Sequence, residues 1–101
     1  MINNKNLVQK YYEMWNSQDF KMAESILSPN LNFHGSIGIE TVGIEEFKEY
    51  AKTIISAFPN LYHATEIIVG EDAQVAVYVT YIGTHQGKLF DYEPTNNRIN
   101  Y

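Results

Sequence analysis

The sequence predicts one α+β domain in which helices pack on one face of a curved antiparallel sheet. Three stretches carry apolar residues with helical spacing, whereas residues 61–69 and 74–85 are rich in β-branched and aromatic residues. The helical stretches precede these two strands and no helix connects them, which excludes a parallel α/β arrangement. A chain of 101 residues has room for a single domain, over residues 1–101.

The first two helices are predicted from periodicity and from capping residues. Residues 4–16 place one stripe of apolar side chains on a helix, namely Leu7, Val8, Tyr11, Tyr12 and Trp15. Asn3 or Asn4 can cap this helix, because a short side-chain oxygen accepts a backbone N–H that has no helical partner. Asp19 can cap a second, shorter helix, which ends before Pro29 because the residue preceding a proline is disfavoured in helical geometry.

A short strand and a third helix follow. Residues 31–34 alternate between apolar and polar and predict a strand, whereas the three glycines within residues 35–43 predict a loop. The apolar stripe of residues 44–58 predicts the third helix, which Pro59 ends. Four carboxylates are expected to form a solvated helix face: Glu40, Glu45, Glu46 and Glu49.

The second half of the chain predicts a long β-hairpin over residues 61–69 and 74–85, with residues 70–73 as its turn. In its second strand, three valines and Tyr81 share one face, and the other face carries Ala76, Tyr78, Thr80 and Ile82. Neither face is strongly polar, so both are expected to be covered at least in part. Residues 98–101 resume the alternation and predict a last strand.

The composition excludes several classes of function. The net charge is −5 and the basic residues are scattered, so a nucleic-acid partner is not expected. The chain has no cysteine, which excludes disulfides, thiolate metal sites and cysteine nucleophiles. It shows neither a signal-peptide core nor an apolar run of about 20 residues. We therefore expect a cytoplasmic protein without a membrane partner.

Several short motifs occur along the chain in a fixed order. They are L-V-Q-K-Y-Y-E-M-W-N-S-Q-D at 7–19, N-F-H-G at 32–35, G-I-E-E-F at 43–47 with A-F-P-N-L at 57–61, G-T-H-Q-G at 83–87, and P-T at 94–95. In this order the motifs resemble those of the SnoaL-like polyketide cyclases, and the resemblance spans the whole chain.

This resemblance implies the cone-shaped fold shared with nuclear transport factor 2, ketosteroid isomerase and scytalone dehydratase. In that fold a strongly bent antiparallel sheet wraps three N-terminal helices around an apolar cavity. Its members range from cyclases and isomerases to non-catalytic binding modules, so the fold alone does not supply a reaction. SnoaL-like cyclases are longer and carry their proposed acid–base aspartate on C-terminal strands. We therefore expect a C-terminally short domain that lacks the last strands, either as a fragment or as a shortened member.

Two residues are candidates for catalysis. His34 carries an imidazole, which titrates near neutrality and suits a general base that removes a proton beside a carbonyl. The resemblance places His34 where isomerases of this fold carry their carboxylate base, and it places Tyr11 where they carry a phenol that donates to an oxyanion. The alternative readings remain open: His34 as a hydrogen-bonded wall residue, and Tyr11 as a core tyrosine.

The remaining site candidates are aromatic walls and a polar rim. The predicted ligand-binding residues are Trp15, Phe33, Phe58, Tyr78 and, at the rim, His85. No functional role is predicted for His63. The three histidines are spaced unlike known metal ligands, so no metal site is expected.

The resemblance and these residues together predict a SnoaL-like domain that binds a small, apolar, carbonyl-bearing molecule. If the domain is catalytic, the resemblance implies a cofactor-free cyclase or isomerase that acts by proton transfer. The alternative is a non-enzymatic ligand-binding or dimerisation module of the same fold. The strand over residues 74–85 is long and poor in charge, so an unpaired edge there favours pairing with another chain. We therefore expect a homodimer that forms through the sheet.

Overall fold

A computed structural model describes residues 4–35 and 38–100 of the chain. The order of elements is α1 (Asn4–Ser17), the 3-10 helix η1 (Phe20–Met22), α2 (Ala23–Ile26), β1 (Asn32–His34), β2 (Glu40–Val42), α3 (Ile44–Ala57), β3 (Tyr62–Glu71), β4 (Gln74–Thr84) and β5 (Arg98–Asn100). The predicted helices, the long hairpin and the last strand are therefore confirmed. Asn3 and Tyr101, for which a cap and a strand end were predicted, lie outside the described residues.

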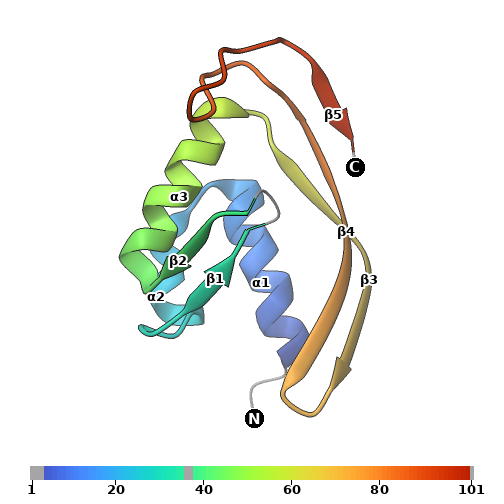
Figure 1. The fold of residues 1–101 in the computed structure, drawn as a ribbon. Coiled ribbons are helices and arrows are strands. Elements are labelled where there is room, and N and C mark those ends of the chain that lie inside the picture. Colours follow the sequence, from blue (N-terminus) through green and yellow to red (C-terminus); the bar gives the residue numbers. More distant parts are fainter. Residues whose placement is uncertain (1–3, 36–37, 101) are drawn as a thin grey trace.

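The helices lie on the concave side of a bent sheet (Figure 1). In the described residues β3, β4 and β5 form an antiparallel three-stranded sheet in that order, and β1 pairs with β2 in a separate small hairpin. The long β3–β4 ribbon curves around α1, and the β1–β2 hairpin lies with α1 and α3 inside that curve (Figure 1). This is the predicted α+β arrangement, and its sheet is not closed.

β3 carries an irregularity of the kind that bends a strand. The register of β3 against β4 shifts between Thr65 and Ile67, so Glu66 is an extra residue in its strand. A β-bulge of this kind bends its strand and increases the local twist. The strands pair as far as Glu71 and Gln74, which leaves a turn of two residues where four were predicted. Asp72 accommodates this tighter turn with a positive φ of 52°.

The predicted loop over residues 35–43 contains a strand. Asn32, Phe33 and His34 pair with Val42, Thr41 and Glu40 of β2. The backbone N–H of Gly35 donates to the carbonyl of Ile39, which closes this hairpin. The prediction that Glu40 belongs to a solvated helix face was therefore wrong, because Glu40 begins a strand that ends before α3.

The core forms where α1 and α3 meet the inner face of the sheet. Its buried members are Met14, Trp15, Ala23, Phe47, Ala51 and Leu61. The Trp15 ring meets the rings of Phe20 and Phe47 edge-on, at centroid distances of 5.2 and 5.9 Å. Edge-to-face pairs of this kind add to the stabilisation that burial itself supplies.

Side-chain hydrogen bonds fix the ends of α1 and η1. Asp19 caps the start of η1, as predicted: its side chain accepts a hydrogen bond from the backbone N–H of Lys21 at 3.3 Å. Asn4 does not act as the cap that was predicted, because it already lies within α1. Its side chain donates to the carbonyl of Asp72 in the β3–β4 turn. None of the helices in the described part of the chain combines the length and apolar character that crossing a lipid bilayer requires.

Candidate functional site: an aromatic cavity with two histidines

A cavity of about 410 Å³ lies among α1, α3, the end of β1 and the concave face of the sheet. Most of its wall is aromatic, with side chains from Tyr11, Tyr12, Trp15, Phe33, Tyr50, Phe58 and Tyr81. His34 and His63 supply the imidazoles, and Gly35, Ile54, Leu61, Leu89 and Ile99 complete the lining. No Asp, Glu, Lys or Arg occurs in the lining given by the described residues. The cavity therefore suits an uncharged and largely apolar molecule.

The structure brings five of the predicted site residues to this cavity. They are Tyr11, Trp15, Phe33, His34 and Phe58. They come from α1, from β1 and from the end of α3, so the site depends on the packing of three separate segments.

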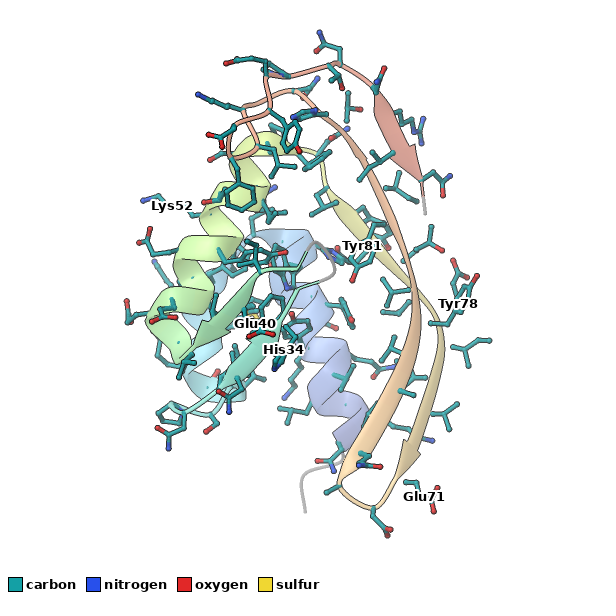
Figure 2. The ribbon with its side chains drawn as sticks, in the orientation of Figure 1. His34, Glu40, Lys52, Glu71, Tyr78 and Tyr81 are labelled. Atoms are coloured by element: carbon teal, nitrogen blue, oxygen red, sulfur yellow. The ribbon has the colours of Figure 1, made fainter. Side chains whose placement is uncertain are left out.

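Tyr78 lies away from the cavity, which corrects its assignment as a wall residue. Its side chain is 65% exposed and points outward from β4, whereas Tyr81 points toward the helices (Figure 2). Neighbouring residues of a strand face opposite sides, so residues an odd number apart lie on opposite faces. The inner position belongs to Tyr81, with the result that one face of this part of β4 is covered and the other is exposed.

His85 is buried but does not line the cavity. Its ring stacks on Phe58 at a centroid distance of 5.3 Å, and its Nδ1 lies 3.2 Å from Oγ1 of Thr95. Backbone hydrogen bonds join His85 to Asn96 and Asn97. His85 thus packs against Phe58, which lines the cavity, and holds the loop before β5 by hydrogen bonds.

His34 is paired with a carboxylate at the mouth of the cavity. Its Nδ1 lies 3.1 Å from Oε1 of Glu40, the residue directly opposite it in the β1–β2 pair. Both side chains project together from this hairpin (Figure 2), and they are 68% and 71% exposed. A carboxylate bonded to one ring nitrogen orients an imidazole and leaves the other nitrogen for a ligand. Glu40 was not among the predicted site residues, because β2, which places it opposite His34, was not predicted.

Tyr11 presents a neutral phenol to the cavity. Burial is the main cause that raises the pKa of Tyr11 well above its usual value, and a hydrogen bond from Trp15 opposes that rise. An indole N–H can only donate, so the Tyr11 oxygen accepts from Trp15 and keeps its own proton available. The Tyr11 and Tyr12 rings pack edge-to-face, with their centroids 4.9 Å apart. The phenol is thus a candidate donor to a ligand oxygen.

His63 also lines the cavity, although no functional role was predicted for it. It is only 5% exposed, and burial lowers its pKa to about 4. Its Nδ1 has no hydrogen-bond partner among the described residues. The register of the hairpin places it: His63 lies opposite Tyr81, so the two share the inner face of the sheet. The predicted four-residue turn, without the bulge in β3, would have paired His63 with Thr80, so the sequence carried no signal for this position.

Residues 4–35 and 38–100 contain no cluster of side chains able to hold a metal ion. Among the described residues that line the cavity, the titratable side chains are the two imidazoles and the tyrosine phenols.

Comparisons with known proteins agree with this architecture. The profile of the SnoaL-like polyketide cyclase family matches residues 5–101. No curated protein matches the chain. Among solved structures, AclR of Streptomyces galilaeus, a candidate hydroxylase, is 27% identical with a TM-score of 0.77. The match covers 95% of this chain and 60% of AclR, so the chain spans less than two thirds of that relative.

Two further structures share the fold at lower identity. A candidate SnoaL-like polyketide cyclase of Jannaschia sp. CCS1 is 20% identical with a TM-score of 0.84, over 96% of this chain and 69% of that protein. IdmH of Streptomyces antibioticus, a candidate polyketide cyclase, is 18% identical with a TM-score of 0.80, over 98% of this chain and 77% of IdmH. At this identity the likeness concerns the fold.

Proposed function

Because the chain belongs to the SnoaL-like polyketide cyclase family, we propose that it binds an apolar, carbonyl-bearing, polyketide-like molecule in the aromatic cavity and catalyses proton transfer on it without a cofactor. The reaction is an enolisation that leads to intramolecular aldol cyclisation or to isomerisation. The observation that carries this proposal is the pair of His34 and Glu40, 3.1 Å apart at the cavity mouth.

The proposed reaction begins at His34. The ring nitrogen that does not face Glu40 removes a proton from a carbon next to the ligand carbonyl, which forms an enolate. Glu40 stabilises the imidazolium that results, because an opposite charge at hydrogen-bond distance favours the protonated ring. For cyclisation, the enolate carbon attacks a second carbonyl carbon of the same molecule, and the new alkoxide takes the proton back. No oxidant or reductant is needed.

Tyr11 is the proposed donor to the enolate oxygen. Burial keeps its phenol protonated, and the hydrogen bond from Trp15 leaves the Tyr11 proton free to point into the cavity. A donor held in an apolar site stabilises developing negative charge more strongly than the same donor in water.

The test is the exchange of the α-protons of α-tetralone, an aromatic ketone, in heavy water. We expect the wild-type protein to accelerate this exchange, measured by proton NMR. His34→Ala should reduce the acceleration by roughly 10²–10⁴-fold, the range for a general base. The free energy of unfolding should change little, because the His34 side chain is exposed.

Thermal unfolding of the same variant separates catalysis from structure. Unchanged exchange together with a loss of about 1–3 kcal/mol in stability would assign His34 a purely structural role. Unchanged exchange with unchanged stability would leave the base proposal without support as well.

A second candidate function is a ligand-binding module without catalysis. The exposure of both His34 and Glu40 favours it, because water at the reacting group weakens electrostatic catalysis. If α-tetralone binds but its exchange is no faster than in buffer, this second function is the correct one.

A further inference from the structure

His63 lies within an aromatic cage on the inner face of β3. Its ring centroid is 4.7 Å from that of Tyr81, 5.2 Å from that of Trp15 and 5.5 Å from that of Tyr12. All of these rings also line the cavity. With 5% of its surface exposed, His63 lies inside, whereas the exposed His34 lies at the mouth. The cavity therefore has an imidazole at each of two depths.

The backbone of His63 is held by the end of α1. The side chain of Asn16 donates to the His63 carbonyl at 3.0 Å and accepts from the His63 N–H at 2.7 Å. On the other side, His63 pairs with Tyr81 in the β3–β4 ladder. These contacts hold the backbone of His63 on both sides. A fixed backbone helps to keep the ring in place when a ligand binds, and recognition requires a group that is held in position.

The chemistry of this ring is that of a neutral polar group in an apolar wall. No Asp, Glu, Lys or Arg lies in the cavity lining of the described residues. The His63 ring lines the cavity, and because its Nδ1 is enclosed without a partner in the described part of the chain, Nε2 is the nitrogen that can meet a ligand. A neutral imidazole has one N–H donor and one lone pair, so it can hydrogen-bond a hydroxyl or a carbonyl. It supplies no positive charge, and an anion placed beside it would lose its hydration without compensation.

We propose that His63 is a specificity-determining residue, which selects aromatic ligands that carry an uncharged hydroxyl or carbonyl group over ligands of the same shape that are ionised. The inference rests on the proposed function only in placing the ligand in this cavity; it does not require that the ligand reacts. His63 is thus a recognition group, and His34 remains the proposed base.

The test compares three aromatic probes of nearly equal shape by isothermal titration calorimetry on the whole chain. They are naphthalene, β-naphthol and β-naphthoate. The wild-type protein should bind β-naphthol roughly three- to tenfold more tightly than naphthalene, as one neutral hydrogen bond provides. It should bind β-naphthoate more weakly than both, because the carboxylate would be desolvated without a charged partner.

Two substitutions at His63 and one elsewhere locate the effect. His63→Phe keeps a ring and removes both nitrogens, so β-naphthol and naphthalene should bind it equally. His63→Gln keeps a donor and an acceptor and should retain part of the preference. Tyr78→Phe is the control, because Tyr78 lies on the outer face of β4 and outside the lining, and it should preserve the wild-type order of affinities.

A direct measurement covers the case in which His63→Phe does not fold. The ring nitrogens of His63, labelled for NMR in the wild-type protein, should shift on addition of β-naphthol and not on addition of naphthalene. Equal affinities for all three probes, or no shift of the ring nitrogens, would overturn the role of His63 while leaving proton transfer at His34 intact. Binding of none of the probes would contradict both proposals, whereas selective binding without exchange of α-tetralone would contradict catalysis alone.

Discussion

The two cavity histidines differ in what surrounds them. His34 shares a small hairpin with Glu40 and is open to water, whereas His63 is enclosed by aromatic rings, and the described lining of its cavity contains no Asp, Glu, Lys or Arg. Burial penalises a protonated imidazole, and a neighbouring carboxylate favours it. The same residue type therefore serves as a proposed base at one position and as a neutral hydrogen-bonding group at the other.

Glu40 offers a test of the base that leaves His34 in place. Glu40→Gln removes the negative charge that stabilises the imidazolium, so we expect exchange of α-tetralone to fall by about tenfold or more. Stability should change by less than about 1 kcal/mol, because exposed ion pairs contribute little. Glu49→Gln, an equally conservative change at an exposed residue of α3, is the control and should leave the exchange rate unchanged. Equal rates for both variants would remove Glu40 from the mechanism.

The depressed pKa of His63 predicts how stability depends on pH. The folded protein keeps this ring neutral down to about pH 4, whereas the unfolded chain protonates it near pH 6.5. Between these values the unfolded state binds the extra proton, so the free energy of unfolding falls as the pH falls. The contribution is fully present above pH 6.5, and about 3 kcal/mol of it is lost by pH 4.

Carboxylates also titrate in the lower part of this window, so the measurement is a difference between proteins. Urea unfolding at several pH values should give a steeper loss of stability for the wild type than for His63→Phe, which has no titrating ring. Parallel curves for the two proteins would contradict a buried, neutral His63.

At the scale of elements, the segment that follows β4 is hydrogen-bonded to the last residue of α3. The backbone N–H groups of Gln86 and Gly87 both donate to the carbonyl of Ala57, at 2.9 and 3.0 Å. This contact leaves no room for a side chain, because a Cβ on Gly87 would lie 2.0 Å from the backbone oxygen of Ser56. The loop that carries Leu89 to the cavity therefore begins from a fixed point.

We expect Gly87→Ala to destabilise the protein by about 1–3 kcal/mol, since backbone on both sides must move to admit the methyl group. Denaturant unfolding measures this loss. Lys88→Ala is the neighbouring control; its side chain is exposed and forms only a 3.9 Å ion pair with Glu93, so its effect should stay within about 0.5 kcal/mol. Similar unfolding midpoints for the two variants would contradict a close contact between Gly87 and the backbone of Ser56.

At the scale of the whole molecule, the cavity predicts stabilisation by ligands. A ligand that binds only the folded protein at a hundred times its dissociation constant adds about 2.7 kcal/mol to the free energy of unfolding. We expect aromatic ketones to raise the melting temperature and to quench the fluorescence of Trp15, which lines the cavity. Tyr78→Phe, on the outer face, should respond as the wild type does. A ligand series that changes neither temperature nor emission would count against a binding cavity.

The outer face of the sheet predicts self-association. Tyr62, Ile67, Val69 and Tyr78 are each more than half exposed there. Within the described residues, β5 covers only Ile82 to Thr84 of β4, which leaves the rest of that edge unpaired. Unpaired edges and exposed apolar patches favour contact with another chain. We propose that a second copy of this chain occupies this face.

Analytical ultracentrifugation of the 101-residue chain at low micromolar concentration tests this proposal. The wild type should sediment as a dimer, and Tyr78→Glu should shift it toward the monomer. Lys52→Glu is the control, because Lys52 lies on the far side of the molecule from β3 and β4 (Figure 2). A wild-type monomer that unfolds cooperatively would contradict the dimer.

Local pattern was enough to predict most elements of this fold. The apolar stripes of α1 and α3 and the β-branched residues of the hairpin report the period of each element directly. β2 was not predicted because three residues carry too short a pattern, and their strand exists through pairing with β1. The alternation in β4 correctly predicted that Tyr78 and Tyr81 lie on opposite faces. It could not predict that the Tyr78 face is exposed, because exposure depends on what else packs against the sheet.

The sequence by itself determined that this protein is an α+β domain of its family, and it identified four of the aromatic residues that line the cavity, namely Tyr11, Trp15, Phe33 and Phe58. These properties follow from residue type and local spacing. Only the tertiary structure decided that His34 meets Glu40, that Tyr81 and not Tyr78 faces the cavity, and that His63 is enclosed by rings from α1 and β4. The physical reason is that burial and pairing are set by contacts between segments distant in sequence, which the spacing of residues within one element does not report.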